Sequence, residues 1–121
     1  APNWRNSRYM LKQRIFEFIE VHLDDTELSP KKIAQANRIS PSYLYSLFAD
    51  NNTTVNQFIQ ARRLQKAYEM LVTDSNGALT VSEIAYLVGF KNASHFSRTF
   101  SRHFRIAPRD ARQSGLAGRG A

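Results

Sequence analysis

The chain has 121 residues, 42% of them hydrophobic, which suffices for one packed domain or two very small ones. It has no cysteine, which excludes disulfide bonds, thiolate chemistry and cysteine-bound zinc. A formal net charge of +7 indicates a polyanionic partner. No apolar run reaches the roughly 18 residues of a membrane span, and no stretch has the pattern of a secretory leader. We therefore expect a cytoplasmic protein without a membrane partner.

The positive charge is concentrated in the second half of the chain. Residues 1–60 hold seven Lys/Arg and six Asp/Glu, a balance of +1, whereas residues 61–121 hold ten and four, a balance of +6. A solvated basic face would account for the charge alone, so the patterns along the chain must decide what the charge serves.

Residues 1–7 have no clear pattern and are expected to be an irregular lead-in. Residues 8–53 are predicted to form a first helical subdomain. Its opening helix should run from Arg8 to Leu23, because apolar residues recur there at helical spacing. The apolar face of this helix consists of Leu11, Ile15, Phe18, Ile19 and Leu23.

Two short helices follow in this subdomain. They begin at Ser29-Pro30 and Ser40-Pro41, where a capping serine precedes a proline at the first helical position. Asn37 and Arg38 make the turn between them, and Asn37 is expected in the left-handed region, which asparagine tolerates. The buried side of the second helix is predicted to be Leu44, Leu47 and Phe48, with Ser42, Tyr45, Ser46 and Ala49 on the other side.

Residues 54–73 are predicted to form a long linker helix. Thr54 and Gln57 have the spacing of a capping box, and Arg62, Arg63 and Lys66 give the helix a basic side. Eighteen helical residues span about 27 Å. Two helices held apart by such a rod could lie about one DNA turn, roughly 34 Å, from each other. The predicted buried stripe of the linker is Phe58, Ala61, Leu64, Tyr68 and Leu71.

A second subdomain is predicted over residues 74–112. Thr80 and Glu83 form a second capping box, which should satisfy two backbone N–H groups at the start of a helix. Gly89 is placed for a left-handed turn, and Asn92 for the cap of the next helix. The apolar face of the first helix is predicted to be Ile84, Leu87 and Val88.

The helix after Asn92 combines an apolar strip with a polar, basic side. Phe96, Phe100 and Phe104 recur every four residues and should be buried. The opposite side has no acidic residue and consists of Ser94, Ser97, Arg98, Ser101 and Arg105. This is the pattern of a helix-turn-helix whose second helix reads the DNA major groove. The alternative is a surface helix that happens to be basic.

The two subdomains have similar patterns. In the first subdomain, Ile33-Ala34 is followed after four residues by Ile39. In the second, Ile84-Ala85 is followed after four residues by Phe90. The later copy then has one extra residue before its apolar strip. A short helix should follow from Pro108 to Arg112, and residues 113–121 are expected to be a disordered tail.

These motifs resemble those of AraC/XylS-type transcription regulators. IAxxxGF, SHFSRTFSRHF and APRDAR are similar to the second helix-turn-helix signature of that family. KKIAQANRISPSYLYSLF and VNQFIQARRLQKAYEML are similar to its first unit and linker helix. The resemblance covers about residues 8–112. It implies an all-α fold of seven helices, binding of double-stranded promoter DNA and usually activation of transcription.

The chain departs from the family pattern at four positions. Arg38 and Arg105 stand at frequent glycines, Ala107 at a frequent Ser/Thr cap, and Ala111 at a usual aromatic residue. Ala107 and Ala111 predict a seventh helix that is less firmly anchored than in other family members. Family members also carry a sensor or dimerisation domain that this stretch lacks. RNA polymerase is a candidate second partner.

The resemblance implies specific DNA contacts. Arg98 is the strongest base-reading candidate, because a guanidinium can bond bidentately to guanine. Tyr45 could instead be a half-buried packing residue. Each residue expected to bind phosphate could instead be a solvent-exposed charge. The base-reading set is Ser42, Tyr45, Ser46, Ala93, Ser94, Ser97 and Arg98. The phosphate-binding set is Lys32, Ser40, Arg62, Lys91, Asn92, Ser101 and Arg102.

Catalysis is not expected. The sequence has no glycine-rich phosphate loop and no Ser/His/Asp arrangement, and no acidic residue is placed to orient His95 or His103. We expect neither a cofactor nor a metal ion. The remaining alternatives are a helical protein-interaction module and a non-specific nucleic-acid binder, including one for RNA. A large preference for one duplex distinguishes a regulator from both.

Overall fold

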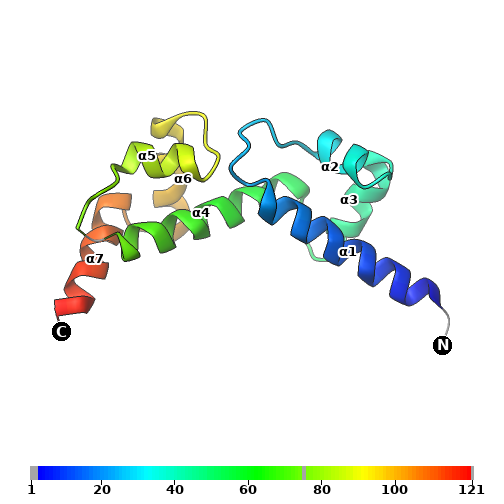
Figure 1. The fold of residues 1–121 in the computed structure, drawn as a ribbon, viewed down its shortest axis with the longest axis horizontal. Coiled ribbons are helices and arrows are strands. Elements are labelled where there is room, and N and C mark those ends of the chain that lie inside the picture. The colour runs from blue at the N-terminus through cyan, green and yellow to red at the C-terminus, as the bar shows by residue number, and fades with distance from the viewer. Residues whose placement is uncertain (1–2, 75, 121) are drawn as a thin grey trace. The chain divides into compact units, whose positions relative to one another are not determined.

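The computed structural model describes residues 3–74 and 76–120, with side chains described from residue 7 to residue 115 apart from residue 75. This part of the chain forms seven helices and no strand, as the resemblance implied (Figure 1). The helices are α1 (Asn3–Val21), α2 (Pro30–Ala36), α3 (Pro41–Ala49), α4 (Val55–Thr73), α5 (Val81–Leu87), α6 (Ala93–Phe104) and α7 (Pro108–Gly120).

The helix ends differ from those expected. α1 begins at Asn3, within the expected lead-in 1–7, and ends before Leu23. α7 continues to Gly120, so the prediction of disorder is wrong for the backbone of residues 113–120. Residues 1–2 and 121, the outermost parts of the lead-in and tail, lie outside the described residues.

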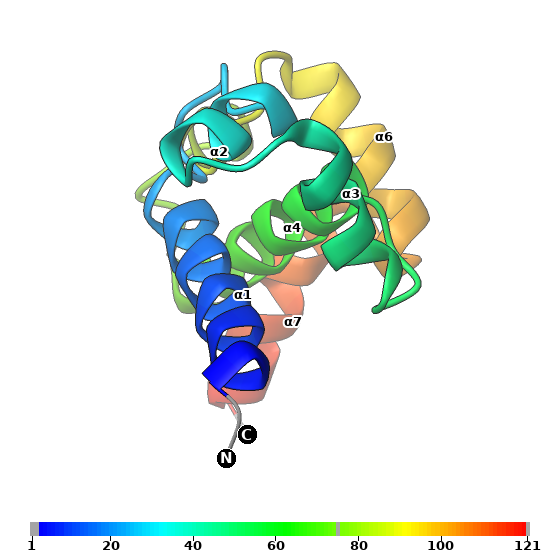
Figure 2. The same ribbon diagram turned by 90° about the vertical axis from the view of Figure 1, so that its right-hand side faces the viewer.

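The chain divides into two compact units, each with its own core. Unit 1 comprises Ala1–Leu23 and Glu27–Gln60, and thus contains α1, α2, α3 and the beginning of α4 (Figure 2). Its core joins apolar residues from all four helices and from the segment after α1. These are Ile15, Ile19, Leu23, Ile33, Ala34, Leu44, Leu47, Phe48, Val55 and Ile59. Phe16, Phe48 and Phe58 pack against one another at its edge, with ring centroids 5.1–5.7 Å apart.

Unit 2 comprises Asp24–Thr26 and Ala61–Ala121. Its core joins the rest of α4 to α5, α6 and α7. The buried residues are Leu64, Ala67, Leu71, Ile84, Ala85, Val88, Phe90, Phe96, Phe100 and Ala111. The predicted phenylalanine strip of α6 is confirmed as core, because Phe96 and Phe100 are fully buried and Phe104 packs beside them.

Side-chain caps begin most of the helices. The backbone N–H groups of Lys32 and Tyr43 donate to the hydroxyls of Ser29 and Ser40, at 3.2 and 3.1 Å. The N–H of His95 donates to Asn92 Oδ1 at 2.9 Å. These three predicted caps are confirmed, and each satisfies one N–H that the helix itself leaves unpaired.

The two predicted capping boxes differ. At the start of α4 the exchange is reciprocal, since the N–H of Gln57 donates to Thr54 Oγ1 and the N–H of Thr54 donates to Gln57 Oε1, both at 3.1 Å. At the start of α5 only the Glu83 N–H bonds back, to Thr80 Oγ1 at 3.0 Å. The Glu83 carboxylate accepts the Thr80 hydroxyl at 3.2 Å instead. The prediction that this box satisfies two backbone N–H groups is therefore wrong.

The turns of the two helix pairs use the same backbone bonds. The N–H of Ile39 donates to Ala34 O at 3.1 Å, and the N–H of Phe90 donates to Ala85 O at 2.9 Å. Each turn has one residue with positive φ. In unit 2 it is Gly89 at 106°, as predicted.

In unit 1 the residue with positive φ is Arg38, at 57°, and not Asn37. Asn37 has a φ of −102°, and its buried side chain donates to Ile33 O at 2.8 Å. The Asn37 amide thus caps the end of α2, and the next residue, Arg38, adopts the left-handed conformation.

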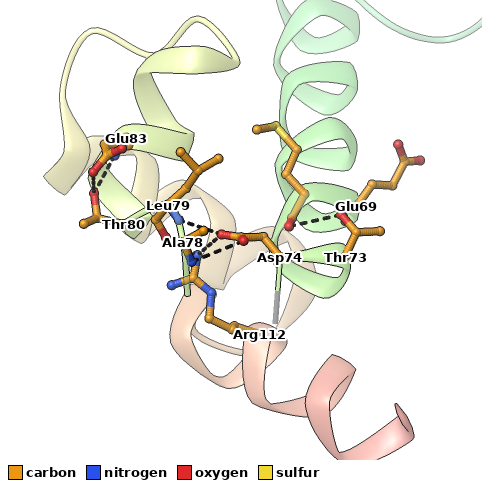
Figure 3. A network of polar contacts seen from close by, with 9 residues as sticks. Glu69, Thr73, Asp74, Ala78, Leu79, Thr80, Glu83 and Arg112 are labelled. Atoms are coloured by element: carbon orange, nitrogen blue, oxygen red, sulfur yellow. Dashed lines mark hydrogen bonds and ion pairs between the residues drawn. The ribbon is translucent and has the colours of Figure 1, made fainter. Parts of the chain in front are cut away.

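α7 is anchored by polar groups that local sequence did not indicate (Figure 3). The Arg112 guanidinium lies 3.3 Å from an Asp74 carboxylate oxygen and donates to Leu79 O. Asp74 also accepts the N–H groups of Ala78 and Leu79, at 3.2 and 2.8 Å. One side-chain pair therefore holds α7 to the loop between α4 and α5.

Gly115 extends this anchorage. A Cβ on Gly115 would lie only 2.7 Å from Val72 O of α4, so a glycine is needed for α7 to approach this closely. Ala111 is fully buried one turn earlier. α7 is thus held both by polar groups and by the close packing of small residues, while the expectation that it is less firmly anchored than in relatives stays a prediction.

One predicted apolar residue is not in the core. Ile84 and Val88 are buried as expected, but Leu87 is 51% exposed, and so is its neighbour Tyr86 at 53%. α5 has only seven residues, and its buried side is filled by Ile84 and Ala85. Leu87 therefore points away from the core at the end of the helix.

Candidate nucleic-acid interface

α6 presents a polar, basic side opposite its phenylalanines. Ser94, Arg98 and Arg102 are exposed, while Ser97 and Ser101 are half-buried along the same side. No acidic residue lies on this helix. Asn92 caps its first turn, and Arg105 ends it in the left-handed region with φ 64°. The helix is thus fixed at both ends, and its core side is anchored by aromatic packing.

The guanidinium side of α6 is hollowed. An open hollow of about 560 Å³ is lined by Ser97, Arg98, Ser101, Arg102 and Arg105. Three guanidiniums and two hydroxyls supply hydrogen-bond donors without a competing carboxylate among them. Such a surface suits phosphate oxygens and the acceptor groups of guanine.

α3 presents a polar side of different chemistry. Ser42, Tyr45 and Ser46 are exposed, so the alternative of a half-buried packing role for Tyr45 is not supported. The Ser46 hydroxyl donates to Tyr43 O at 2.8 Å. α3 carries no charged residue at all. Any contact it makes with a nucleic acid must therefore rely on hydroxyls, apolar groups and backbone.

The two helices can be compared position by position from their caps. Ser40 corresponds to Asn92, and Leu44 and Phe48 to Phe96 and Phe100. The outward positions also correspond in pairs. With the residue of unit 1 first, the pairs are Ser42/Ser94, Tyr45/Ser97, Ser46/Arg98, Ala49/Ser101 and Asp50/Arg102. Two of the positions that are arginine in unit 2 are therefore serine and aspartate in unit 1.

The remaining predicted contact residues lie at helix starts and on neighbouring helices. Lys32 and Lys91 are exposed, Ala93 and Arg62 half-buried. Ser40 and Asn92 accept the cap bonds with their side-chain oxygens, so the Ser40 hydroxyl hydrogen, the Asn92 amide hydrogens and the N–H groups of the first helical residues remain as donors for a phosphate.

Arg63, predicted on the basic side of the linker, has another role. Its guanidinium donates to Asp25 O at 2.7 Å, and burial lowers the pKa of Arg63. Arg63 therefore fixes the loop after α1, and the side chain is turned toward the protein.

Sequence reasoning missed a charged cluster at the end of α3. Arg8 of α1 donates to the Asp50 carboxylate, Lys12 lies 3.8 Å from the same oxygen, and the Arg8 guanidinium carbon is 5.9 Å from the centroid of the Tyr43 ring. The partners are about forty residues apart, so no local pattern signals the pairing.

No group of three or more His, Asp or Glu side chains is arranged to hold a metal ion within residues 7–115 outside position 75. None of the helices that the structure describes is long and apolar enough to cross a membrane.

Comparison with known proteins decides the family. A family model described as a helix-turn-helix domain matches residues 33–114. A transcriptional regulator from Chromobacterium violaceum, described as having an AraC-type DNA-binding domain, has a similar crystal structure. Its TM-score is 0.71 at 26% identity, over 86% of this chain and 94% of that one. The chain belongs to the AraC/XylS family.

Two further proteins are similar to this chain. The C-terminal domain of the response regulator yesN from Fusobacterium nucleatum has a TM-score of 0.76 at 26% identity, over 84% of this chain and 96% of that one. The transcriptional activator RhrA of Rhizobium meliloti (strain 1021) is 32% identical over 99 residues, which are 82% of this chain and 31% of RhrA. The chain thus spans about a third of the length of this relative.

Two departures from the AraC/XylS pattern have a clear structural context. Arg38 and Arg105, which the resemblance places at frequent glycines, both adopt positive φ, of 57° and 64°. The backbone geometry is therefore kept without glycine, at a cost in strain of about 1 kcal/mol or more each.

Proposed function

We propose that this domain binds double-stranded promoter DNA sequence-specifically and regulates transcription by placing α3 and α6 in successive major grooves. The observation that carries the proposal is α6 itself. Phe96 and Phe100 are fully buried, and Ser94, Arg98 and Arg102 are exposed on the opposite side. A helix so anchored can present its donors to base edges without rearrangement.

The proposed roles follow from side-chain chemistry. Arg98 reads a guanine through two hydrogen bonds, and the methyl of Ala93 contacts a thymine. Serines bond base edges or phosphates and discriminate less. The base-reading set is Ser42, Tyr45, Ser46, Ala93, Ser94, Ser97 and Arg98. The phosphate-binding set is Lys32, Ser40, Arg62, Lys91, Asn92, Ser101 and Arg102.

The length of α4 supports the use of successive grooves. The helix has 19 residues, which span about 28 Å. This approaches the roughly 34 Å between successive turns of the major groove. One chain would then cover two half-sites on one face of the duplex.

The biological setting follows from the relatives. RhrA is a transcriptional activator, and this domain matches 31% of its length. We propose that the present domain also activates transcription, in the cytoplasm, as part of a protein with a separate sensor or dimerisation domain. RNA polymerase is the proposed second partner, and the domain itself is not an enzyme.

Selection of bound duplexes from a random DNA pool tests the proposal. An enriched sequence with two half-sites about one turn apart is expected. On that duplex, Arg98→Ala should cost about 1–3 kcal/mol and relax the preference at one base pair, whereas Arg102→Ala should weaken all duplexes similarly. Equal losses for Arg98→Ala on the selected and a scrambled duplex would reject its base-reading role.

A protein-binding function is the second candidate, because Tyr86 and Leu87 are both more than half exposed on α5. A domain that binds only protein shows neither a steep fall of DNA affinity with salt nor a preferred duplex. A non-specific nucleic-acid binder shows the salt dependence without the preference.

A further inference from the structure

A cluster of four side chains lies at the end of α3 in unit 1, outside the predicted DNA contacts. Arg8 and Lys12 stand one turn apart on α1, and both approach the same carboxylate oxygen of Asp50. Arg8 also lies over the ring of Tyr43. Two cations of one helix are thus held beside the reading helix by one acidic residue.

Asp50 occupies a position where unit 2 has an arginine. Counted from the caps Ser40 and Asn92, it corresponds to Arg102, which we propose as a phosphate contact. It lies one turn after the exposed Ser46. A carboxylate here stands at the border of the surface proposed to face the DNA backbone.

Stability of the fold does not explain this carboxylate. The Asp50 side chain is 49% exposed, and ion pairs this exposed contribute little to stability. Asp50 is also the C-cap of α3, where the helix dipole disfavours negative charge.

Asp50 keeps its charge near neutral pH. The hydrogen bond from Arg8, with the charges of Arg8 and Lys12, lowers the pKa of Asp50. The same hydrogen bond raises the pKa of Arg8. The cluster therefore has a net charge of about +1, and it would have +2 without the carboxylate.

We infer that Arg8 and Lys12 are further contacts to DNA phosphate and that Asp50 restrains them, so that the carboxylate limits the affinity of unit 1 for the duplex backbone. The carboxylate occupies the guanidinium that a phosphate would otherwise bind, and it repels phosphate directly. This inference rests on the proposed function, because it requires α3 to face DNA.

Asp50→Asn tests the inference, because it removes the charge and keeps the shape of the side chain. Binding of the whole chain to the selected duplex and to a scrambled one is measured by fluorescence anisotropy at several salt concentrations. Asp50→Asn should bind both duplexes about three- to tenfold more tightly at low salt. The slope of log affinity against log salt should steepen by about 0.9, the value of one additional phosphate contact.

Two further variants complete the experiment. Glu69→Gln removes an equal charge from an exposed site on α4 and should leave the salt slope unchanged. Arg8→Ala in the Asp50→Asn background should remove most of the gain in affinity.

The outcomes separate this inference from the proposed function. If the unmodified chain binds the selected duplex but Asp50→Asn behaves like Glu69→Gln, or binds more weakly, only the inference is overturned. If the unmodified chain binds no duplex, both are overturned.

Discussion

The two helix-turn-helix units have the same backbone architecture but different surface chemistry. Each has a capped first helix, a turn with one positive φ and equivalent turn hydrogen bonds. Yet α3 has no charged residue, whereas α6 carries Arg98 and Arg102. Caps, turns and buried positions therefore determine where the second helix of each pair lies, and the outward positions are free to differ in chemistry.

The largest expected effect concerns the separate cores. Phe96→Ala should cost about 3–5 kcal/mol, because it removes a fully buried ring from the core of unit 2. Urea unfolding measures the loss. Hydrogen exchange should show the loss of protection in α5 and α6, with protection in α1 and α3 retained.

Leu44→Ala is the matched variant in unit 1, and it should cost about 2–5 kcal/mol with the opposite pattern of protection. An equal loss of protection in both units from either variant would show that the two cores unfold together.

The next effect concerns the two turns. Gly89→Ala should destabilise the domain by about 1–3 kcal/mol, because a φ of 106° is unfavourable for any residue with a Cβ. Arg38→Ala at the equivalent position should be nearly neutral, since both residues have a Cβ. Thermal unfolding compares the two, and similar losses would contradict the assigned role of the glycine.

A smaller effect is a gain in stability. Thr99 is buried in unit 2, and its hydroxyl has no hydrogen-bond partner among the described residues, whereas the equivalent residue of unit 1 is Leu47. Thr99→Val should stabilise the domain by about 1–2 kcal/mol, because it replaces an unpaired buried hydroxyl by a methyl group. Thr99→Ser, which keeps the hydroxyl, should give no gain in urea unfolding.

The smallest effect is also a gain. Arg38→Gly should stabilise unit 1 by about 0.5–1 kcal/mol, because glycine adopts a φ of 57° without strain and this outweighs its greater entropy when unfolded. Arg105→Gly, at 64°, should behave likewise. A lower melting temperature for both variants would show that the arginine side chains contribute more than the backbone strain costs.

The sequence predicted the elements that depend on local chemistry. Ser40-Pro41 and Asn92 fix helix starts through bonds to residues three positions away, and the spacing of Phe96 and Phe100 fixes the buried side of α6. These signals are short in range, so they can be found without knowledge of the fold.

The features that were missed depend on distant partners. Arg112 pairs with Asp74 and Arg8 with Asp50, across about forty residues in each case. Gly115 is required only because α4 passes close by. The prediction that Leu87 is buried was wrong, because helical spacing does not show which positions at the end of a short helix lie over the core. The DNA contacts stay predictions, since exposure alone does not identify a ligand.

The absence of charge on α3 has a consequence for how recognition by this domain should be measured. Hydroxyl and van der Waals contacts displace few counterions, so their strength changes little with ionic strength, whereas arginine–phosphate contacts weaken steeply. Under the proposed function, the contribution of α6 to the total affinity should therefore fall more steeply with added salt than the contribution of α3. The preferred sequence of each half should change little, because phosphate contacts carry no sequence information.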